Sequence, residues 1–178
     1  MTVAPTQEGI ELTGFVGEVI KRLGRLVVDV QQCEARRGIV RIAPETTVEV
    51  ARELFAMTGS RLATVTGIEV RDGIDLLYHW AFEPAGVVLT VKALAARPEM
   101  AVESIAPVVA GANWIEREIH DLLGAQFRNH PDMRRLILDD SWPEGVYPLR
   151  RDFDQVLDRP PLPSHPPTAP GAEEGGST

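Results

Sequence analysis

Apolar residues recur at the spacing of an amphipathic helix in several parts of the chain. Residues 15–23 carry such a stripe, and Gly24 ends the helix that it predicts. Residues 48–57 carry another, with Thr47 as the candidate N-terminal cap. Two helices are therefore expected in the N-terminal third of the chain.

The C-terminal half carries two more stretches that favour helix. One covers residues 100–109 and is interrupted at Gly111. The other covers residues 114–123, with Asn113 as its candidate cap and Gly124 directly after it. Both are predicted to be helical.

Strands are predicted from short stretches rich in β-branched and aromatic residues. Five such stretches are found, at residues 26–30, 38–42, 61–70, 74–82 and 87–94. The pair Asp72-Gly73 is typical of a tight hairpin, and a Pro-Ala-Gly turn separates the last two strands. The order of elements predicts an α+β fold, in which helices cover a small, mostly antiparallel sheet.

The domain organisation follows from where this pattern stops. Residues 1–10 are expected to form a flexible leader, and residues 11–153 a single domain. From residue 127 the pattern becomes irregular, apart from a candidate strand at 136–138. Residues 154–178 are rich in proline and glycine and are expected to form an extended or disordered tail.

Composition excludes several classes of protein. The 178 residues are 44% hydrophobic, which is enough for a core, and the net charge of −8 argues against a nucleic-acid partner. With one cysteine, Cys33, the chain forms neither an internal disulfide nor a four-thiolate iron–sulfur site. No stretch reaches the ~18 apolar residues of a membrane span, and no secretory signal is visible. A cytoplasmic location is therefore expected.

The densest charged cluster runs from Glu116 to Asp121. On a helix, Glu116 lies four residues before His120, and Arg117 lies four before Asp121, so local ion pairs on a charged helix face are one interpretation. The other is a metal site built from Glu116, His120 and His130. The two histidines of a zinc-protease helix motif are absent from this cluster.

Two later clusters leave further interpretations open. His130 precedes a proline and suits a turn, where Asp132 is a candidate to orient it as a general base, but no nucleophile is apparent nearby. Residues 139–153 alternate acids and arginines around aromatic residues. This pattern is typical either of a protein interface or of internal pairing that fixes an irregular segment. No glycine-rich nucleotide-binding motif is found.

The order of these residues resembles a known family. The sequence Glu116-Arg117-Glu118, then Asp121-Leu122-Leu123, His130, Arg134 and Leu136-Ile137 is similar to the signature of the thirty-kilodalton subunit of respiratory complex I, called the C subunit in bacteria. The resemblance extends through Pro148 to Phe153 and covers about residues 38–153. The same family includes the equivalent subunit of complex I-related membrane-bound NiFe hydrogenases and formate hydrogenlyase.

The resemblance implies an accessory subunit that has no cofactor of its own. Iron–sulfur clusters and a NiFe site, or quinone and FMN, are then expected in partner subunits. The expected partners are the large catalytic subunit, of the forty-nine-kilodalton type, and small iron–sulfur subunits, with the membrane arm reached indirectly. Such a chain is a non-catalytic part of an oxidoreductase and associates peripherally with the cytoplasmic side of the membrane.

The resemblance also assigns site residues and two possible complexes. No residue is expected to be catalytic, metal-binding or cofactor-binding. The positions expected to serve partner docking or structure are Glu116, Arg117, Glu118, Asp121, His130, Pro131, Asp132, Arg134, Arg135, Tyr147, Arg150, Arg151 and Asp152. Tyr147 stands where complex I members usually have histidine, which favours the hydrogenase type. Alternatives are the equivalent subunit of an NADH:quinone oxidoreductase, an independent metal-dependent enzyme, or a transient assembly factor.

Overall fold

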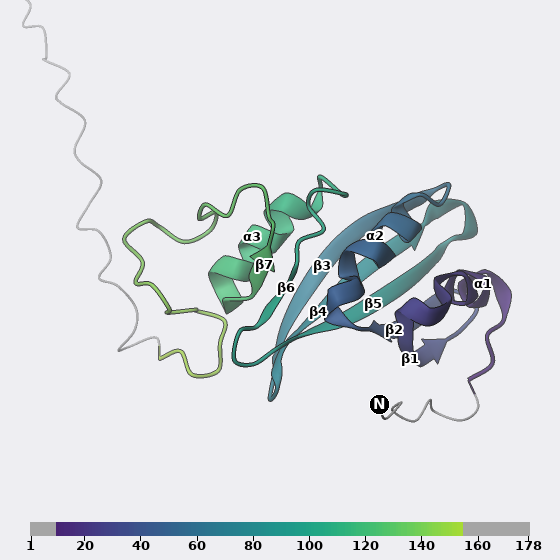
Figure 1. Ribbon diagram of the computed structural model, residues 1–178, viewed down its shortest axis with the longest axis horizontal. Helices are drawn as coiled ribbons and strands as arrows, with labels where there is room; N and C mark the ends of the chain where they lie inside the picture. Colours follow the sequence, from purple (N-terminus) through teal and green to yellow (C-terminus); the bar gives the residue numbers. More distant parts are fainter. Residues whose placement is uncertain (1–9, 155–178) are drawn as a thin grey trace, which may run out of the picture.

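A five-stranded sheet covered by helices on one face forms the body of the molecule. The computed structural model describes residues 10–154 (Figure 1). The main elements are α1 (Gly14–Leu23), β1 (Val27–Cys33), β2 (Arg37–Ile42), α2 (Thr47–Phe55), β3 (Ser60–Val70), β4 (Gly73–Phe82), β5 (Val87–Ala96), β6 (Ala101–Glu103), α3 (Ala112–Leu123) and β7 (Gln126–Arg128). Three 3-10 turns, at Gly24–Leu26, Pro44–Thr46 and Glu83–Ala85, connect them.

The sheet has the order β1-β2-β5-β4-β3 and is antiparallel except where β2 pairs with β5. The β3–β4 hairpin closes where Val70 pairs with Gly73, as the Asp72-Gly73 pair predicts. The predicted meander of β3, β4 and β5 is therefore confirmed, and so is the α+β fold class. A second, two-stranded sheet joins β6 and β7 in parallel.

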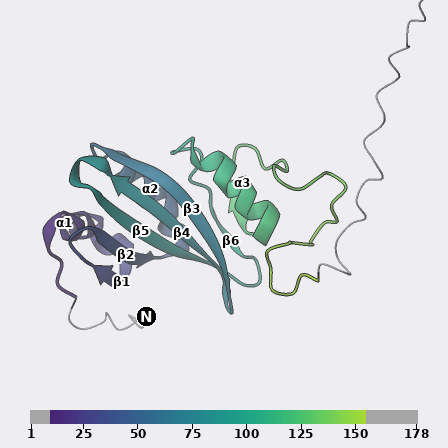
Figure 2. The same cartoon turned by 180° about the vertical axis from the view of Figure 1, so that it is seen from behind.

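The core lies between the sheet and its helices. Alternate residues of β4, among them Tyr78, Trp80 and Phe82, are buried on the covered face. On α1, Val16 and Ile20 pack so closely over Gly38 of β2 that a Cβ there would lie 2.5 Å from Val16 Cγ1. Figure 2, from behind, shows β3, β4 and β5 in front of α2, so the opposite face of the sheet carries no helix from residues 10–154.

The opposite face is held together by polar contacts between strands. His79 of β4 hydrogen-bonds to Thr66 of β3 and Thr90 of β5, at 3.2 and 3.0 Å. Lys92 forms a salt bridge of 3.3 Å with Asp75. These cross-strand pairs fix the register of the three longest strands.

Four predictions of local structure are wrong. Residues 101–103 form strand β6 and residues 104–111 form turns, so the predicted helix over 100–109 does not exist. Residues 136–138 are bends and not a strand. Neither candidate residue caps its helix. The Thr47 hydroxyl donates to the Pro44 carbonyl, and Asn113 lies inside α3, whose N-terminal cap position is occupied by Gly111. Of the predicted leader, only residue 10 is among the described residues, and of the predicted Pro-rich tail, only Asp154 is.

Candidate docking site on helix α3

Helix α3 packs against strand β3 and carries the charged cluster found in the sequence. Ile119 and Leu123 lie over Gly67 of β3, where a Cβ would come within 2.8 Å of Leu123 Cδ1. A larger residue at position 67 would therefore force the Leu123 and Ile119 side chains to move. Residues 129–154, here called the C-terminal segment, run along α3 on the side away from α2 (Figure 1).

Two buried charges of α3 bind the backbone of the C-terminal segment. Arg117 donates from Nε and Nη2 to the carbonyls of Arg134 and Arg135, at 2.7 and 2.9 Å. One helical turn later, Asp121 Oδ2 accepts the backbone N–H groups of residues 136, 137 and 138, at 2.8, 2.8 and 3.3 Å. The irregular backbone thereby finds the partners that a helix or sheet would otherwise supply.

These contacts decide the charge of Asp121. Burial raises the pKa of its carboxyl group, but the three backbone N–H groups and the nearby His120 lower it more, so the pKa lies below its usual value. The local ion pairs expected from the i,i+4 spacing are not formed among the described residues, because Arg117 and Asp121 both reach to a different segment. That prediction is wrong.

Glu116 points the other way, into the core. It is fully buried, and its carboxyl group is bound by the Ser104 hydroxyl at 2.5 Å and the Ile105 N–H at 2.9 Å. His130 Nε2 lies 3.8 Å from Glu116 Oε2. However, His130 Nε2 donates to the Asn113 carbonyl and Nδ1 accepts the Asp132 N–H, which is the pattern of a neutral imidazole. The contact between Glu116 and His130 is therefore not an ion pair.

Glu116 is buried with no cation bound to it among residues 10–154, and this changes the pKa of its carboxyl group. Desolvation raises its pKa from 4.5 to about 7, against the hydrogen bonds of Ser104, Ile105 and Ala106, which lower it. The neighbouring Tyr78 hydroxyl is buried with no hydrogen-bond partner among residues 10–154. Burial and the Glu116 charge both raise the pKa of Tyr78.

The end of α3 is closed by the C-terminal segment. Arg150 Nε donates to the Leu123 carbonyl at 2.7 Å, and the Leu149 N–H donates to the Leu122 carbonyl at 3.1 Å. The Arg150 guanidinium also lies 4.4 Å from the centre of the Tyr147 ring. A cation at the C-terminal end of a helix is favoured by the helix dipole, so Arg150 both caps the helix and anchors the segment.

Gly124 makes this closure possible. It has a φ of +77°, and a Cβ there would lie 2.5 Å from Tyr147 Cζ and 2.7 Å from Arg150 Nη2. We expect Gly124→Ala to lower the free energy of unfolding by about 2–4 kcal/mol, from left-handed strain plus the clash. Urea denaturation measures the loss.

Gly145 provides the matched control for this prediction. Its φ is +78°, but a Cβ there meets nothing within 4 Å. Gly145→Ala should therefore cost only the backbone strain, about 1–2 kcal/mol. Equal losses for the two variants would contradict the close packing of Tyr147 and Arg150 on Gly124.

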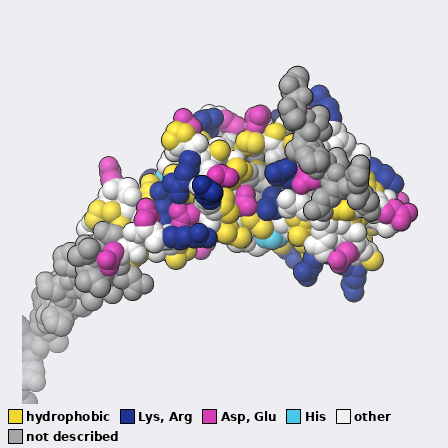
Figure 3. Space-filling model, turned by 90° about the horizontal axis from the view of Figure 1, so that it is seen from below, with side chains coloured by type: hydrophobic (Ala, Val, Ile, Leu, Met, Phe, Trp, Pro, Cys, Tyr) yellow, Lys and Arg dark blue, Asp and Glu magenta, His cyan; other side chains and the backbone are white. Residues whose placement is uncertain are grey.

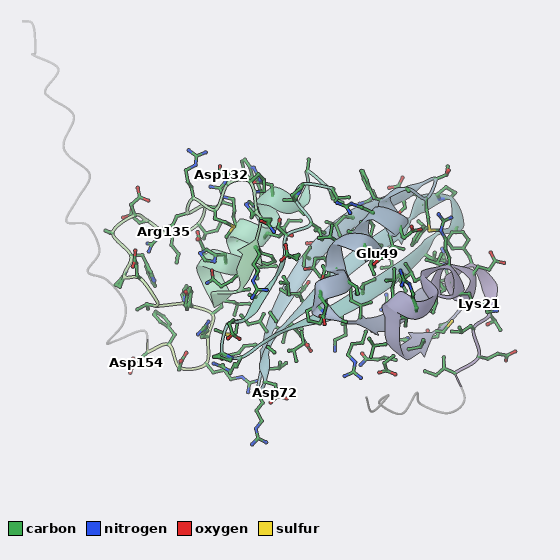
Figure 4. The ribbon with its side chains drawn as sticks, viewed as in Figure 1. Lys21, Glu49, Asp72, Asp132, Arg135 and Asp154 are labelled. Atoms are coloured by element: carbon green, nitrogen blue, oxygen red, sulfur yellow. The ribbon has the colours of Figure 1, made fainter. Side chains whose placement is uncertain are left out.

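The remaining predicted positions lie on the surface or at its edge. Arg134 forms a two-pronged salt bridge with Asp132, at 2.8 and 2.7 Å, and this contact holds the pKa of the Asp132 carboxyl group well below its usual range. The Asp132 carboxylate therefore pairs with Arg134, and the predicted role of this carboxylate in orienting His130 is wrong. Arg135 donates to the Asp139 carbonyl at 2.7 Å. Figure 4 shows Asp132 and Arg135 on the outer part of the segment.

Four other predicted residues, Glu118, Pro131, Arg151 and Asp152, are exposed. Arg151 is fixed through its backbone N–H, which donates to Glu69 of β3 at 2.8 Å. Figure 3 shows the lower face of the molecule, where Lys and Arg side chains are interspersed with acidic ones. The surface there is mixed in charge and not uniformly basic.

The structure brings together only part of the possible metal set. Glu116 and His130 are neighbours, but His120 Nδ1 donates to the Ala125 carbonyl at 2.9 Å. Among residues 10–154, no three His, Cys, Asp or Glu side chains are placed to hold a metal ion. A cavity of about 370 Å³ lies between α3 and the C-terminal segment, and His120, Arg135, Trp142 and Tyr147 are among its lining residues.

Sequence reasoning missed the partners of the buried charges. Ser104 and Ile105 bind Glu116, yet both fell in the stretch predicted as helix. Met100, whose Sδ lies 3.6 Å from Arg150 Nη2, was missed for the same reason. Pro107, which is disfavoured inside a helix, was the available signal against that assignment.

The fold and the site define a class: a small α+β domain whose charged helix fixes a long irregular C-terminal segment. Residues 40–158 match the family described as "Respiratory-chain NADH dehydrogenase, 30 Kd subunit". The chain belongs to this family, as its sequence signature predicted. None of the helices within residues 10–154 is long and apolar enough to cross a membrane.

Relatives from two kinds of complex are similar to this chain. The C subunit of the NADH-quinone oxidoreductase of Geobacter sulfurreducens is 32% identical over 151 residues, which are 80% of this chain and 92% of that protein. Hydrogenase-4 component G of Escherichia coli is 40% identical over 89 residues, which are 50% of this chain but only 16% of that longer protein.

A solved structure has the same fold. One chain of the membrane-bound sulfane sulfur reductase, an archaeal respiratory membrane complex, superposes with a TM-score of 0.68 at 20% identity. The match covers 79% of this chain and 84% of that chain. The family match and the two relatives make the chain a subunit of the thirty-kilodalton type from a complex I-like complex.

Proposed function

We propose that the chain is a cofactor-free accessory subunit of the peripheral arm of a complex I-like energy-converting oxidoreductase. In this role it packs against the large catalytic subunit and supports its assembly on the cytoplasmic side of the membrane. One observation carries the proposal: the charged residues of the family signature bind the chain's own backbone. Arg117, Asp121 and Arg150 hold the C-terminal segment in a fixed shape, and binding surfaces of fixed shape lose less entropy on association.

The surface of this segment suits protein binding. Ile137 and Leu149 expose 54% and 60% of their area beside arginines and aromatic residues. Apolar, aromatic and arginine side chains are the usual anchors of protein interfaces. The redox centres of the reaction are then carried by partner subunits: iron–sulfur clusters together with a NiFe site, or with quinone and FMN.

Purification of the tagged chain from its native host tests this proposal. We expect a large catalytic subunit of the forty-nine-kilodalton type to co-purify in equal amount, together with small iron–sulfur subunits. A chain that remains monomeric under mild extraction, with no such subunit, would overturn the proposal. Mature complexes that lack the chain would instead support a transient assembly factor.

We infer a hydrogenase-type complex as the first candidate. Tyr147, which packs on Gly124 beside Arg150, occupies the position that favoured this type, and the relative in hydrogenase-4 supports it. The equivalent subunit of an NADH:quinone oxidoreductase is the alternative, supported by the Geobacter relative, whose length is almost fully matched. The sequence of the co-purified large subunit decides between them. Two Cys-x-x-Cys pairs would ligate nickel and iron, whereas their absence indicates quinone chemistry.

A further inference from the structure

A groove separates α3 from strand β3 on the side of the helix away from the buried charges. Its volume is about 230 Å³, and it is lined by residues 64–67 of β3, by one side of α3 and by Leu149. The α3 lining consists of Ile115, Glu118, Ile119, Leu122 and Leu123. Glu118 is the single charged residue in this described lining.

Exposed apolar side chains gather around this groove. Trp114, next to the lining residue Ile115, exposes 68% of its area, and Leu149 exposes 60%. Six large hydrophobic residues are exposed within residues 10–154, and of these Leu149 lines the groove while Trp114 directly precedes its lining residue Ile115 on α3. An apolar surface concentrated around one groove marks a protein-binding site.

Trp114 and Glu118 form a pair suited to one kind of side chain. They lie four residues apart on α3, so their Cβ atoms are about 5–6 Å apart on the same side of the helix. Neither side chain makes a hydrogen bond or ion pair within the described part of the chain. An arginine is planar and can lie on the indole face while its guanidinium pairs with the carboxylate. A lysine lacks this flat, forked geometry.

From the apolar lining and this unpartnered pair we infer that the groove between α3 and β3 binds an apolar segment of the large subunit that places an arginine on Trp114 and Glu118. The inference rests on the proposed function and names the surface and the partner chemistry within it. The partner's apolar side chains fill the groove beside Ile115, Leu122 and Leu149. Its arginine supplies the cationic partner that Glu118 does not have among residues 10–154.

The chain's own tail is the competing occupant, because it contains an arginine and leucines. The described chain ends at Asp154, whereas Trp114 lies at the start of α3, where Asn113 binds His130. Figure 4 shows Asp154 and Asp132, the latter next to His130, at opposite ends of the C-terminal segment. The exit of the tail and the Trp114 end of the groove are thus well separated, which favours a separate subunit.

Photo-crosslinking in the native complex tests the inference. A benzoylphenylalanine replaces Trp114, and in a control chain it replaces Phe55, which is 49% exposed at the end of α2. We expect position 114 to cross-link to an arginine-containing peptide of the large subunit, and position 55 not to reach that peptide. A cross-link from position 114 to residues 155–178 of the same chain, to a second copy of the chain, or to no subunit at all would overturn the inference.

Binding measurements separate this inference from the proposed function. Trp114→Ala and Glu118→Gln should each weaken the association with the purified large subunit by about tenfold or more, while Phe55→Ala leaves it unchanged. The double variant should lose less than the product of the two single effects, because one arginine serves both residues. Wild-type binding with no effect of either variant would reject the groove but keep the accessory-subunit role. No binding by the wild-type chain would reject that role itself.

Discussion

Asp121→Ala should release the C-terminal segment from α3. The variant leaves the N–H groups of residues 136–138 without their shared acceptor, in a partly buried position. Hydrogen bonds to a charged group each contribute about 1.5–3 kcal/mol, and unsatisfied buried groups cost more, so opening of the segment should become easier by about 3–5 kcal/mol. Because the segment is irregular and lies on the outside, it should open locally before the sheet unfolds.

Hydrogen exchange measures this release residue by residue. The amides of residues 136 and 137 should exchange about a hundredfold faster or more in Asp121→Ala, while amides of β4 and β5 keep their protection. Arg117→Ala should act in the same direction, because it leaves two carbonyls without a donor. Glu118→Ala is the control, since Glu118 is exposed and makes no contact of this kind in the described chain. Unchanged protection at residues 136–138 in Asp121→Ala would contradict the assigned role.

The second large effect is a pH dependence centred on Glu116. Its pKa is about 7 in the folded chain, above its ordinary value of 4.5. Between these values the folded state holds a proton that the unfolded state has lost, so stability falls as the pH rises from about 4.5 to 7. At 1.36 kcal/mol for each pKa unit, the loss is roughly 3 kcal/mol, complete above pH 7.

Glu116→Gln isolates this effect, because glutamine resembles the protonated carboxyl group. Relative to wild type, the variant should gain about 3 kcal/mol in free energy of unfolding between pH 4.5 and 7.5. Urea denaturation across this range gives the difference, and subtracting the two curves removes the titration of other groups such as Asp121 and His79. Glu118→Gln, at an exposed position on the same helix, is the matched control. If the curve of Glu116→Gln ran parallel to that of wild type, Glu116 would ionise in the folded chain with no loss of free energy of unfolding. That result would contradict the effect expected from its complete burial.

Local patterns were sufficient to predict most of the fold. The helices at Gly14–Leu23, Thr47–Phe55 and Ala112–Leu123, and the meander from Ser60 to Ala96, all follow from apolar periodicity and turn residues. The stretch after Pro98 failed because its residues favour helix, whereas the buried Glu116 takes the Ile105 N–H and the Ser104 hydroxyl as partners. Such a tertiary contact outweighs a propensity of a few tenths of a kcal/mol per residue.

The contacts of the signature residues could not be predicted from the sequence. The family signature selected Arg117, Asp121 and Arg150, and all three fix the C-terminal segment. Spacing on the helix suggested that Arg117 and Asp121 pair with each other, because i,i+4 neighbours are close on any helix. The sequence contains no signal that the backbone of residues 134–138 would lie close enough to α3 to bind Arg117 and Asp121 instead. Long-range contacts of this kind become visible only in the folded chain.

Hydrogen exchange of the chain within its native complex tests the central claim most directly. If α3 and the C-terminal segment form the docking surface, then peptides from residues 112–123 and 129–154 should exchange more slowly in the complex than in the purified chain. Peptides from α1 and β1, at the other end of the molecule (Figure 1), should exchange at the same rate in both. Protection confined to α1 and β1, with no change along α3, would contradict the account.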